Sequence, residues 1–257
     1  MICMFKPSTP RIEKLAELFP EVIAELEIIF SNKSNVYIDW SNVVHWQDRL
    51  GWHIHLKRLK QLLDSFDTIQ NVKIYEGTLK GNQKSEAGIQ DSKNMGYEEK
   101  TKPVKLMEIS IDTTSVPLNS PILLQNFINK GLLSKLNLET IEFLNSRLAD
   151  FNKQGIFYIE EKKCNFDVEI GRDMLRDFDK NGIENFILWS GDSDFADPIC
   201  QLKEDNKDVY LFATAREVSS ELNATKIPIF EIKKIREFIC WPKEIPQSTK
   251  NKIERLA

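Results

Sequence analysis

The chain has 257 residues, 41% hydrophobic and 29% charged, a composition that excludes intrinsic disorder and suits one large α/β domain with a modest addition. The net charge of -4 excludes a protein that coats nucleic acid through bulk positive charge, so phosphate contacts must come from a local patch or a metal ion. Four scattered cysteines, no signal-peptide pattern and no membrane-spanning run predict a cytoplasmic protein with free thiols and no membrane contact.

The first part of the chain predicts helices followed by alternating strands and helices. Thr9 and Pro10 are typical of a helix start, and a second helix is expected from Pro20 to about Phe30, which makes residues 1–33 a helical extension. The further predicted elements are strands at 35–39, 72–78 and 102–109 and helices at 56–66 and 84–96. Strands that alternate with helices indicate a parallel sheet.

The middle of the chain interrupts this alternation. Residues 110–137 contain two prolines and many small polar residues, so we expect an irregular insertion there. Helical spacing returns at 138–148. Further on, Asn165 is a suitable cap for a helix that carries Asp167 in its first turn, where the helix dipole alone explains an acid.

A short acidic loop follows the next predicted strand. Phe186–Trp189 is a compact apolar run, and Ser190-Gly191 ends it with a turn. Asp192 and Asp194 then place two carboxylates close together, which a bound divalent cation would stabilise. Taken alone, these acids are better explained as ordinary caps at the start of a helix.

The last part of the chain predicts two more strands, at 208–213 and 227–230, and a helix at 232–241. The main domain is therefore expected at residues 34–241. Residues 242–257 are polar with little periodicity, so we expect a loose tail there.

In such a sheet, four acids are expected to lie close together. The carboxyl ends of strands on either side of a reversal in strand order face one crevice. Asp39 ends one strand, Asp192 and Asp194 follow another, and Asp167 begins a helix between them in the sequence. If they converge, the site needs Mg²⁺ or Mn²⁺ to offset the repulsion, a pattern of metal-assisted phosphodiester hydrolysis.

The sequence resembles the NYN family, the PIN-like nuclease domains that include the LabA-like proteins. Three motifs in family order carry the resemblance: Tyr37-Ile-Asp-Trp-Ser-Asn42, Lys163-Cys-Asn-Phe-Asp-Val-Glu-Ile-Gly-Arg-Asp173 and Ser190-Gly-Asp-Ser-Asp-Phe195. The resemblance implies a three-layer α/β/α Rossmann-like (PIN-like) sandwich with a central, mainly parallel sheet. It also implies a ribonuclease, an endoribonuclease that hydrolyses RNA with Mg²⁺ or Mn²⁺.

The resemblance assigns roles to particular residues. Asp39, Asp167, Asp192 and Asp194 would be the catalytic metal ligands, supported by Asn42 and Ser190. Asp173 is a secondary candidate, because six residues of helix turn it about 120° away from Asp167. Trp40 and Cys164 stand where the family usually has glycine, which predicts a narrower or more apolar mouth.

RNA, single-stranded or structured, is the expected partner, and the sequence leaves open whether the chain forms a homo-oligomer. The candidate phosphate contacts are Lys162, Lys163, Arg172 and Arg216, although surface charge alone is the better explanation of each one taken singly. A non-catalytic RNA-binding or regulatory module is the main alternative function. An aspartyl-phosphate phosphatase is a weaker one, because the D-x-D follows a late strand and no second paired-Asp motif follows it.

Overall fold

The computed structural model describes residues 5–79 and 81–255, except for the side chains at positions 162, 163, 215, 254 and 255. The chain divides into two compact units. The first contains Met1–Pro103 and Cys164–Ala257, and the second contains Val104–Lys163. Within the described residues, no helix has the length and hydropathy needed to cross a membrane.

The first unit is built on a six-stranded parallel sheet. Its strands are β1 (Ser34–Asp39), β2 (Ile69–Thr78), β3 (Glu98–Pro103), β6 (Asn185–Trp189), β7 (Asp208–Ala213) and β8 (Ile229–Glu231). Their order is β3-β2-β1-β6-β7-β8, and all neighbours run parallel. The order therefore reverses between β1 and β6, as in Rossmann-like sheets.

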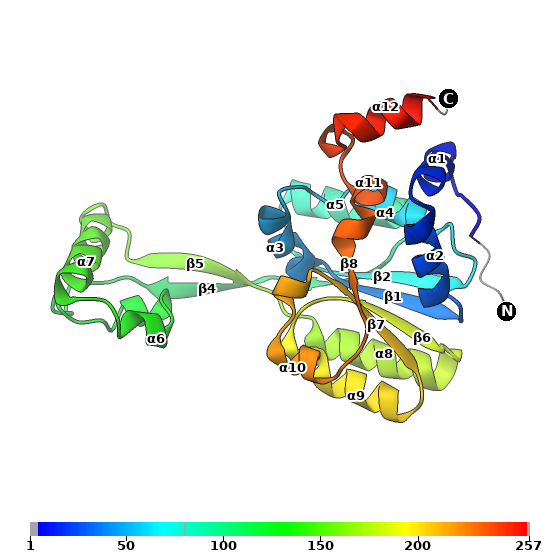
Figure 1. The fold of residues 1–257 in the computed structure, drawn as a ribbon. Helices are drawn as coiled ribbons and strands as arrows, with labels where there is room; N and C mark the ends of the chain where they lie inside the picture. Colours follow the sequence, from blue (N-terminus) through cyan, green and yellow to red (C-terminus); the bar gives the residue numbers. More distant parts are fainter. Residues whose placement is uncertain (1–4, 80, 256–257) are drawn as a thin grey trace. The chain divides into compact units, whose positions relative to one another are not determined.

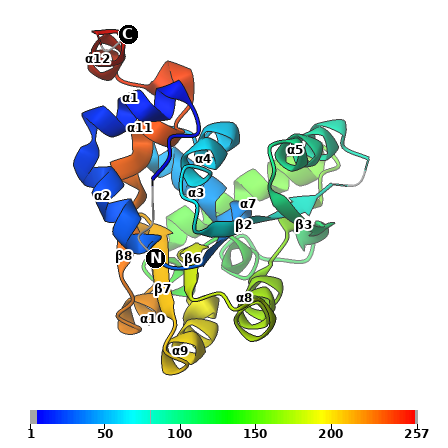
Figure 2. The same ribbon diagram turned by 90° about the vertical axis from the view of Figure 1, so that its right-hand side faces the viewer.

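Helices cover both faces of this sheet (Figures 1 and 2). On one face lie α3 (Trp40–Leu50), α4 (Leu56–Leu63) and α5 (Gln83–Asn94), and on the other lie α8 (Asp167–Asn181) and α9 (Ala196–Glu204). The remaining helices of the unit are α1 (Pro10–Leu18), α2 (Pro20–Ile29), α10 (Ser220–Ala224), α11 (Arg236–Ile239) and α12 (Gln247–Arg255). The predicted α/β/α sandwich with amino-terminal helices is thus confirmed.

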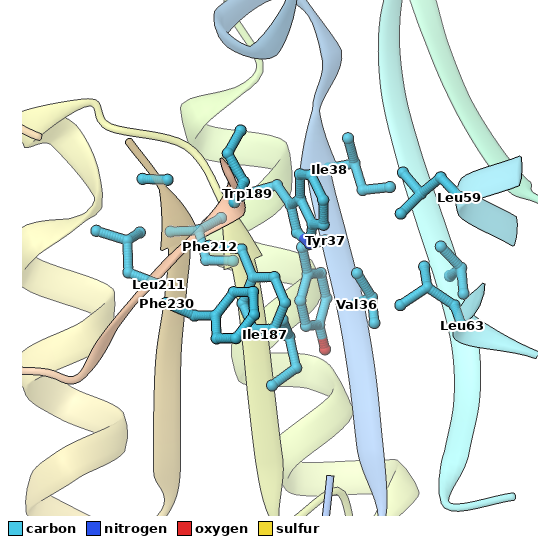
Figure 3. Packing of buried hydrophobic residues seen from close by; sticks show 14 of the residues in the cluster. Val36, Tyr37, Ile38, Leu59, Leu63, Ile187, Trp189, Leu211, Phe212 and Phe230 are labelled. Atoms are coloured by element: carbon cyan, nitrogen blue, oxygen red, sulfur yellow. The ribbon is translucent and has the colours of Figure 1, made fainter. Parts of the chain in front are cut away.

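Alternation along the central strand explains how both faces become buried. All six residues of β1 are buried, and Val36 and Ile38 lie on the side of Leu59 and Leu63 of α4 (Figure 3). Tyr37 points to the opposite face, because successive side chains of a strand alternate. A central parallel strand is covered on both faces, so the polar members of β1, Ser34, Asn35 and Asp39, are buried as well and each takes a hydrogen-bond partner.

A buried polar network attaches α8 to the sheet. The carboxylate of Asp177 accepts hydrogen bonds from Asn35 Nδ2 (2.6 Å), Tyr37 Oη (2.5 Å) and Lys73 Nζ (2.7 Å). Lys73 and Asp177 are both buried, so each charge is paired, as burial requires. This anchor fixes the axis of α8 and thereby the position of Asp167, its first residue.

The second unit is an antiparallel ribbon with two helices. The ribbon pairs β4 (Lys105–Ser110) with β5 (Tyr158–Lys163), and α6 (Lys130–Leu133) and α7 (Leu138–Lys153) lie at one end of it (Figure 1). The irregular stretch expected at 110–137 falls inside this longer unit.

Two predicted segments differ in the structure. The strand expected at 102–109 is divided, because β3 ends at Pro103 and β4 pairs only with β5 among the described strands. Proline has no N–H to donate, which favours the end of a sheet strand there. Within residues 242–257, where a loose tail was expected, α12 spans Gln247–Arg255.

Candidate active site

The site lies where the strand order reverses. β1 and β6 are adjacent, with Ile38 opposite Trp189, so their carboxyl ends lie side by side. Asp39 is the last residue of β1, and Asp192 follows the end of β6 by three positions. Ligands of open α/β sheets bind at this kind of crevice.

Asp39 is held by hydrogen bonds from both strand ends. Its Oδ1 accepts bonds from Ser41 Oγ (2.8 Å) and from the backbone N–H of Asn42 (3.3 Å), which caps α3. Its Oδ2 accepts a bond from Ser190 Oγ (3.2 Å) at the end of β6. Burial raises the pKa of Asp39, and the nearby charge of Asp192 raises it further against these three bonds.

The loop after β6 is held by hydrogen bonds that its backbone N–H groups donate to side chains. The side-chain oxygen of Asn42 accepts a bond from Gly191 N–H (3.2 Å), and Asp192 Oδ1 accepts one from Asp194 N–H (3.2 Å). A Cβ at position 191 would lie 2.0 Å from the backbone oxygen of Glu217, so only glycine fits here without a shift of the backbone. The chain of contacts places Asp192 beside Asp39.

Asp167 approaches the same cluster from the start of α8. Its backbone N–H donates to Asn165 Oδ1 (2.8 Å), while its own Oδ2 is buried without a hydrogen-bond partner among the described residues. Burial raises the pKa of Asp167 to about 6, and the charges of Asp192 and Asp39 and a bond with Asp194 act in the same direction. The other three predicted acids therefore lie close enough to Asp167 to affect its pKa.

A cleft of about 700 Å³ opens beside the cluster between α8 and α9. Asp167 and Asp194 line it together with two further acids, Asp197 and Glu204, and among the described residues no lysine or arginine lines it. Asp39 and Asp192 lie outside the lining. The cleft thus presents a concentrated negative charge next to the strand ends.

The donor chemistry of the cluster suits Mg²⁺ or Mn²⁺. Both ions prefer oxygen ligands, and the unpartnered oxygen of Asp167 is a free donor next to charged carboxylates. Among the described residues, however, no three Asp, Glu, His or Cys side chains are already arranged around one point as a metal site. The residues fit the ion by type, and the ligand set is not preassembled.

The other predicted site residues occupy different places. Asp173 is buried and accepts a hydrogen bond from Tyr75 Oη (3.0 Å), on the side of α8 that faces β2. It therefore belongs with the Asp177 network rather than with the four acids. Trp40 is partly buried against the core, and Cys164 is partly buried with its thiol 3.9 Å from the backbone oxygen of Lys102.

The predicted phosphate contacts are separated. The side chains of Lys162 and Lys163 lie outside the described part of the chain. Arg172 is exposed, 3.5 Å from Asp173. Arg216 lines a pocket of about 220 Å³ together with Arg49 and Lys233, next to Glu217, whose backbone contacts Gly191.

Sequence reasoning missed some of the cations near the site. Lys102, at the end of β3, forms an ion pair with Glu169 in the first turn of α8 (2.8 Å). Arg49 and Lys233 join Arg216 only through the fold, since they are 167 and 17 positions away from it. A single basic residue near the end of an element carries no sequence signal of its own.

Comparisons with known proteins extend this description. The family model of the NYN domain matches residues 129–229, which include Asp167, Asp173, Ser190, Asp192 and Asp194 but not Asp39 or Asn42. No curated protein matches the chain. Among solved structures, a protein of unknown function from Vibrio parahaemolyticus is similar, at 14% identity and a TM-score of 0.49, over 82% of this chain and 96% of that one. The match to the family model confirms the resemblance over residues 129–229, and it is consistent with the NYN family of the PIN-like superfamily.

Proposed function

We propose that the chain is a metal-dependent endoribonuclease. The observation that carries the proposal is the convergence of Asp39, Asp167 and Asp192 at the reversal point of the sheet, where burial and the charge of Asp192 raise the pKa values of Asp39 and Asp167. The similarity of residues 129–229 to a nuclease-like family supports the same class of reaction. Carboxylates that repel one another are a feature of functional sites more often than of structural ones.

The residues of the chain have distinct roles in this proposal. Asp39, Asp167, Asp192 and Asp194 hold the divalent ion, which when bound supplies a water of lowered pKa and offsets charge on the phosphate. Ser190 orients Asp39 by donating to its Oδ2. Asn42 fixes the loop by accepting from Gly191 N–H. Asp167 releases its proton above about pH 6, so its own carboxylate is charged at neutral pH.

RNA binding is part of the proposal. The acidic cleft repels phosphates, so contacts have to come from cations at its margin. Arg49, Arg216 and Lys233 gather around the segment that supports Gly191, which makes them the best supported set. Lys102 lies near the other side of the cluster, paired with Glu169.

A non-catalytic RNA-binding or regulatory module is the second candidate. It is favoured by one observation, namely that the described residues hold no preassembled group of three metal ligands. The two candidates differ in their metal dependence, because only the nuclease needs the ion to act on RNA.

The decisive experiment compares the purified chain with its Asp192→Asn variant on labelled single-stranded and structured RNA, with and without Mn²⁺ or Mg²⁺. We expect cleavage by the parent only with metal, and a loss of about 100-fold or more in the variant. Asp179→Asn is a matched control, because Asp179 is an exposed acid on the same helix as Asp167. It should cleave like the parent.

Melting temperatures give a second measure that does not depend on finding the substrate. Metal should stabilise the parent and the Asp179→Asn control more than Asp192→Asn, since an ion that binds only the folded state stabilises it. If parent and variant bind RNA equally, neither cleaves it and metal stabilises neither, the regulatory module replaces the nuclease.

A further inference from the structure

The second unit exposes an unusual share of apolar side chains. Of the seventeen large hydrophobic residues that are exposed in the described part of the chain, thirteen lie within its 60 residues. They are Leu106, Met107, Leu118, Ile122, Phe127, Leu132, Leu138, Phe143, Phe151, Ile156, Phe157, Tyr158 and Ile159. Single exposed apolar residues are normal, whereas a concentration of this kind marks an interaction surface.

The unit has a small apolar core, and polar contacts also join its segments, so the exposed apolar side chains lie outside its own core. Among its described side chains, the buried apolar residues are Ile111, Leu123, Leu124 and Leu133. Asn145 of α7 donates to the backbone oxygens of Leu118 (2.6 Å) and Ser120 (2.7 Å). Asn152 joins the other end of α7 to Ile111 (3.1 Å) and Ile156 (2.9 Å).

The exposed residues form recognisable surfaces on the helix and on the ribbon. Phe143 and Phe151 are eight positions apart on α7, with Arg147 between them, on the side away from buried Asn145. On the ribbon, the consecutive residues Leu106 and Met107 are both exposed, so both faces of β4 carry apolar groups. A two-stranded ribbon is marginally stable in water by itself.

We propose that this unit is a self-association surface through which two copies of the chain pair. Residues 104–163 contain seven Lys and Arg and seven Asp and Glu, so the unit is neutral while the rest of the chain carries the net charge of -4. A neutral surface can meet its own copy without net repulsion, and it offers no net attraction to RNA.

The size of the apolar surface also fits a second copy. If each of the thirteen side chains exposes about half of roughly 150–200 Å², the unit exposes on the order of 1,000 Å² of apolar surface, distributed over the ribbon, α7 and the loops. A stable interface needs about 800 Å² from each partner. Two-fold pairing is the commonest arrangement of identical chains.

The edges of the ribbon favour β4 as a pairing strand. β5 ends in four consecutive charged residues, Glu160 to Lys163, which oppose pairing at its edge. β4 has only Lys105 and Glu108. Antiparallel pairing of two β4 strands about Met107 and Glu108 sets Leu106 opposite Ile109 and Lys105 opposite Ser110, with no like charges opposed.

The test measures the oligomeric state of the full chain by sedimentation over a range of concentrations. We expect a dimer that weakens by about tenfold or more when Phe143 and Phe151 are both replaced by glutamate, or when Leu106 is. Ile28→Glu is the matched control, because Ile28 is 69% exposed, compared with 62% for Phe143, and lies in the first unit. It should leave the dimer unchanged.

Hydrogen exchange of the parent at low and high concentration provides a measure that needs no variant. Amides of β4 and α7 should become more protected as the concentration rises, while those of the first unit do not. A parent chain that stays monomeric throughout overturns the proposal. A dimer that Ile28→Glu weakens and the second-unit variants do not would equally overturn it, and binding of RNA by monomers through this unit would assign the surface to another ligand.

Discussion

At the scale of single residues, the capping role and the site role of the acids coexist. Asp39 Oδ1 caps α3 while its Oδ2 faces Ser190, and Asp192 caps the turn at Ser193–Phe195 while its charge raises the pKa of Asp167. An aspartate has two oxygens, so one can satisfy a backbone N–H while the other remains a ligand. The ordinary explanation of each acid therefore does not compete with the functional one.

Asp167 makes a prediction about pH. Its pKa is raised to about 6 in the folded chain, compared with an ordinary value of about 3.9 when unfolded. Between these values the folded state binds more protons, so in metal-free buffer the free energy of unfolding should fall as the pH rises from about 4 to 6. Above that window the loss is complete.

Asp167→Asn should remove this contribution. The free energy of unfolding of the variant, measured with urea, should depend less on pH between pH 4 and 6 than that of the parent. At pH 7 the variant should be more stable by up to about 1 kcal/mol, since solvent screens the half-buried position. Asp179→Asn should keep the slope of the parent. If the dependence of unfolding free energy on pH is unchanged in Asp167→Asn, the pKa of this carboxyl group is not raised in the folded chain.

At the scale of elements, the site depends on a close contact between two loops. The backbone at Gly191 meets Glu217, and Ser219 N–H donates to the oxygen of Gly191 (3.0 Å). The loop after β6 is thus supported by the loop after β7, which brings Arg216 close to the acidic turn. Side chains on loops become precise only when the backbone is supported in this way.

Gly191→Ala tests that contact. A methyl group placed 2.0 Å from a backbone oxygen requires both loops to move, so we expect a loss of about 1–3 kcal/mol in thermal or urea unfolding, together with lower activity. Gly88→Ala is the control, because a Cβ there meets nothing within 4 Å on the helix α5. It should be neutral or stabilising by up to about 1 kcal/mol. Equal stabilities of the two variants would mean that the loops are not in contact.

At the scale of the whole molecule, an acidic chain places a local group of cations near its acidic site. The acidic cleft and the net charge of -4 oppose nucleic acid, while Arg49, Arg216 and Lys233 concentrate positive charge near the same strand ends. Local concentration matters because screening limits exposed charges to a range of about 8 Å at physiological salt.

Replacing Arg49 and Arg216 by alanine should weaken RNA binding and reduce its dependence on salt. Each lost contact with a phosphate should flatten the slope of log K against log salt by about 0.7 for single-stranded RNA, as measured by titration at several salt concentrations. Lys6→Ala is a matched control. Exposed Lys6 pairs with Asp67, just before the amino end of β2, and therefore lies at the opposite end of the strands from the acids. An unchanged slope in the arginine variant would exclude this pocket from the RNA path.

The sequence by itself determined the local features of the first unit. Compact apolar runs became β1, β6 and β7, Thr9 and Pro10 begin α1, and three motifs pointed to the family that residues 129–229 match. These features depend on neighbours in the chain, such as a cap, a turn or a buried run, and can therefore be predicted from local sequence patterns.

Only the tertiary structure decided which of these features meet. The reversal of strand order next to β1 sets Asp39 beside Ser190, and the Asp177 network turns Asp173 away from the cluster that Asp167 joins. Lys102 and Arg49 lie near the acids only through the fold, and β4 pairs with β5 rather than with a strand of the main sheet. Such contacts join residues far apart in the chain, so they depend on packing and hydrogen bonding across the whole fold, which no local pattern encodes.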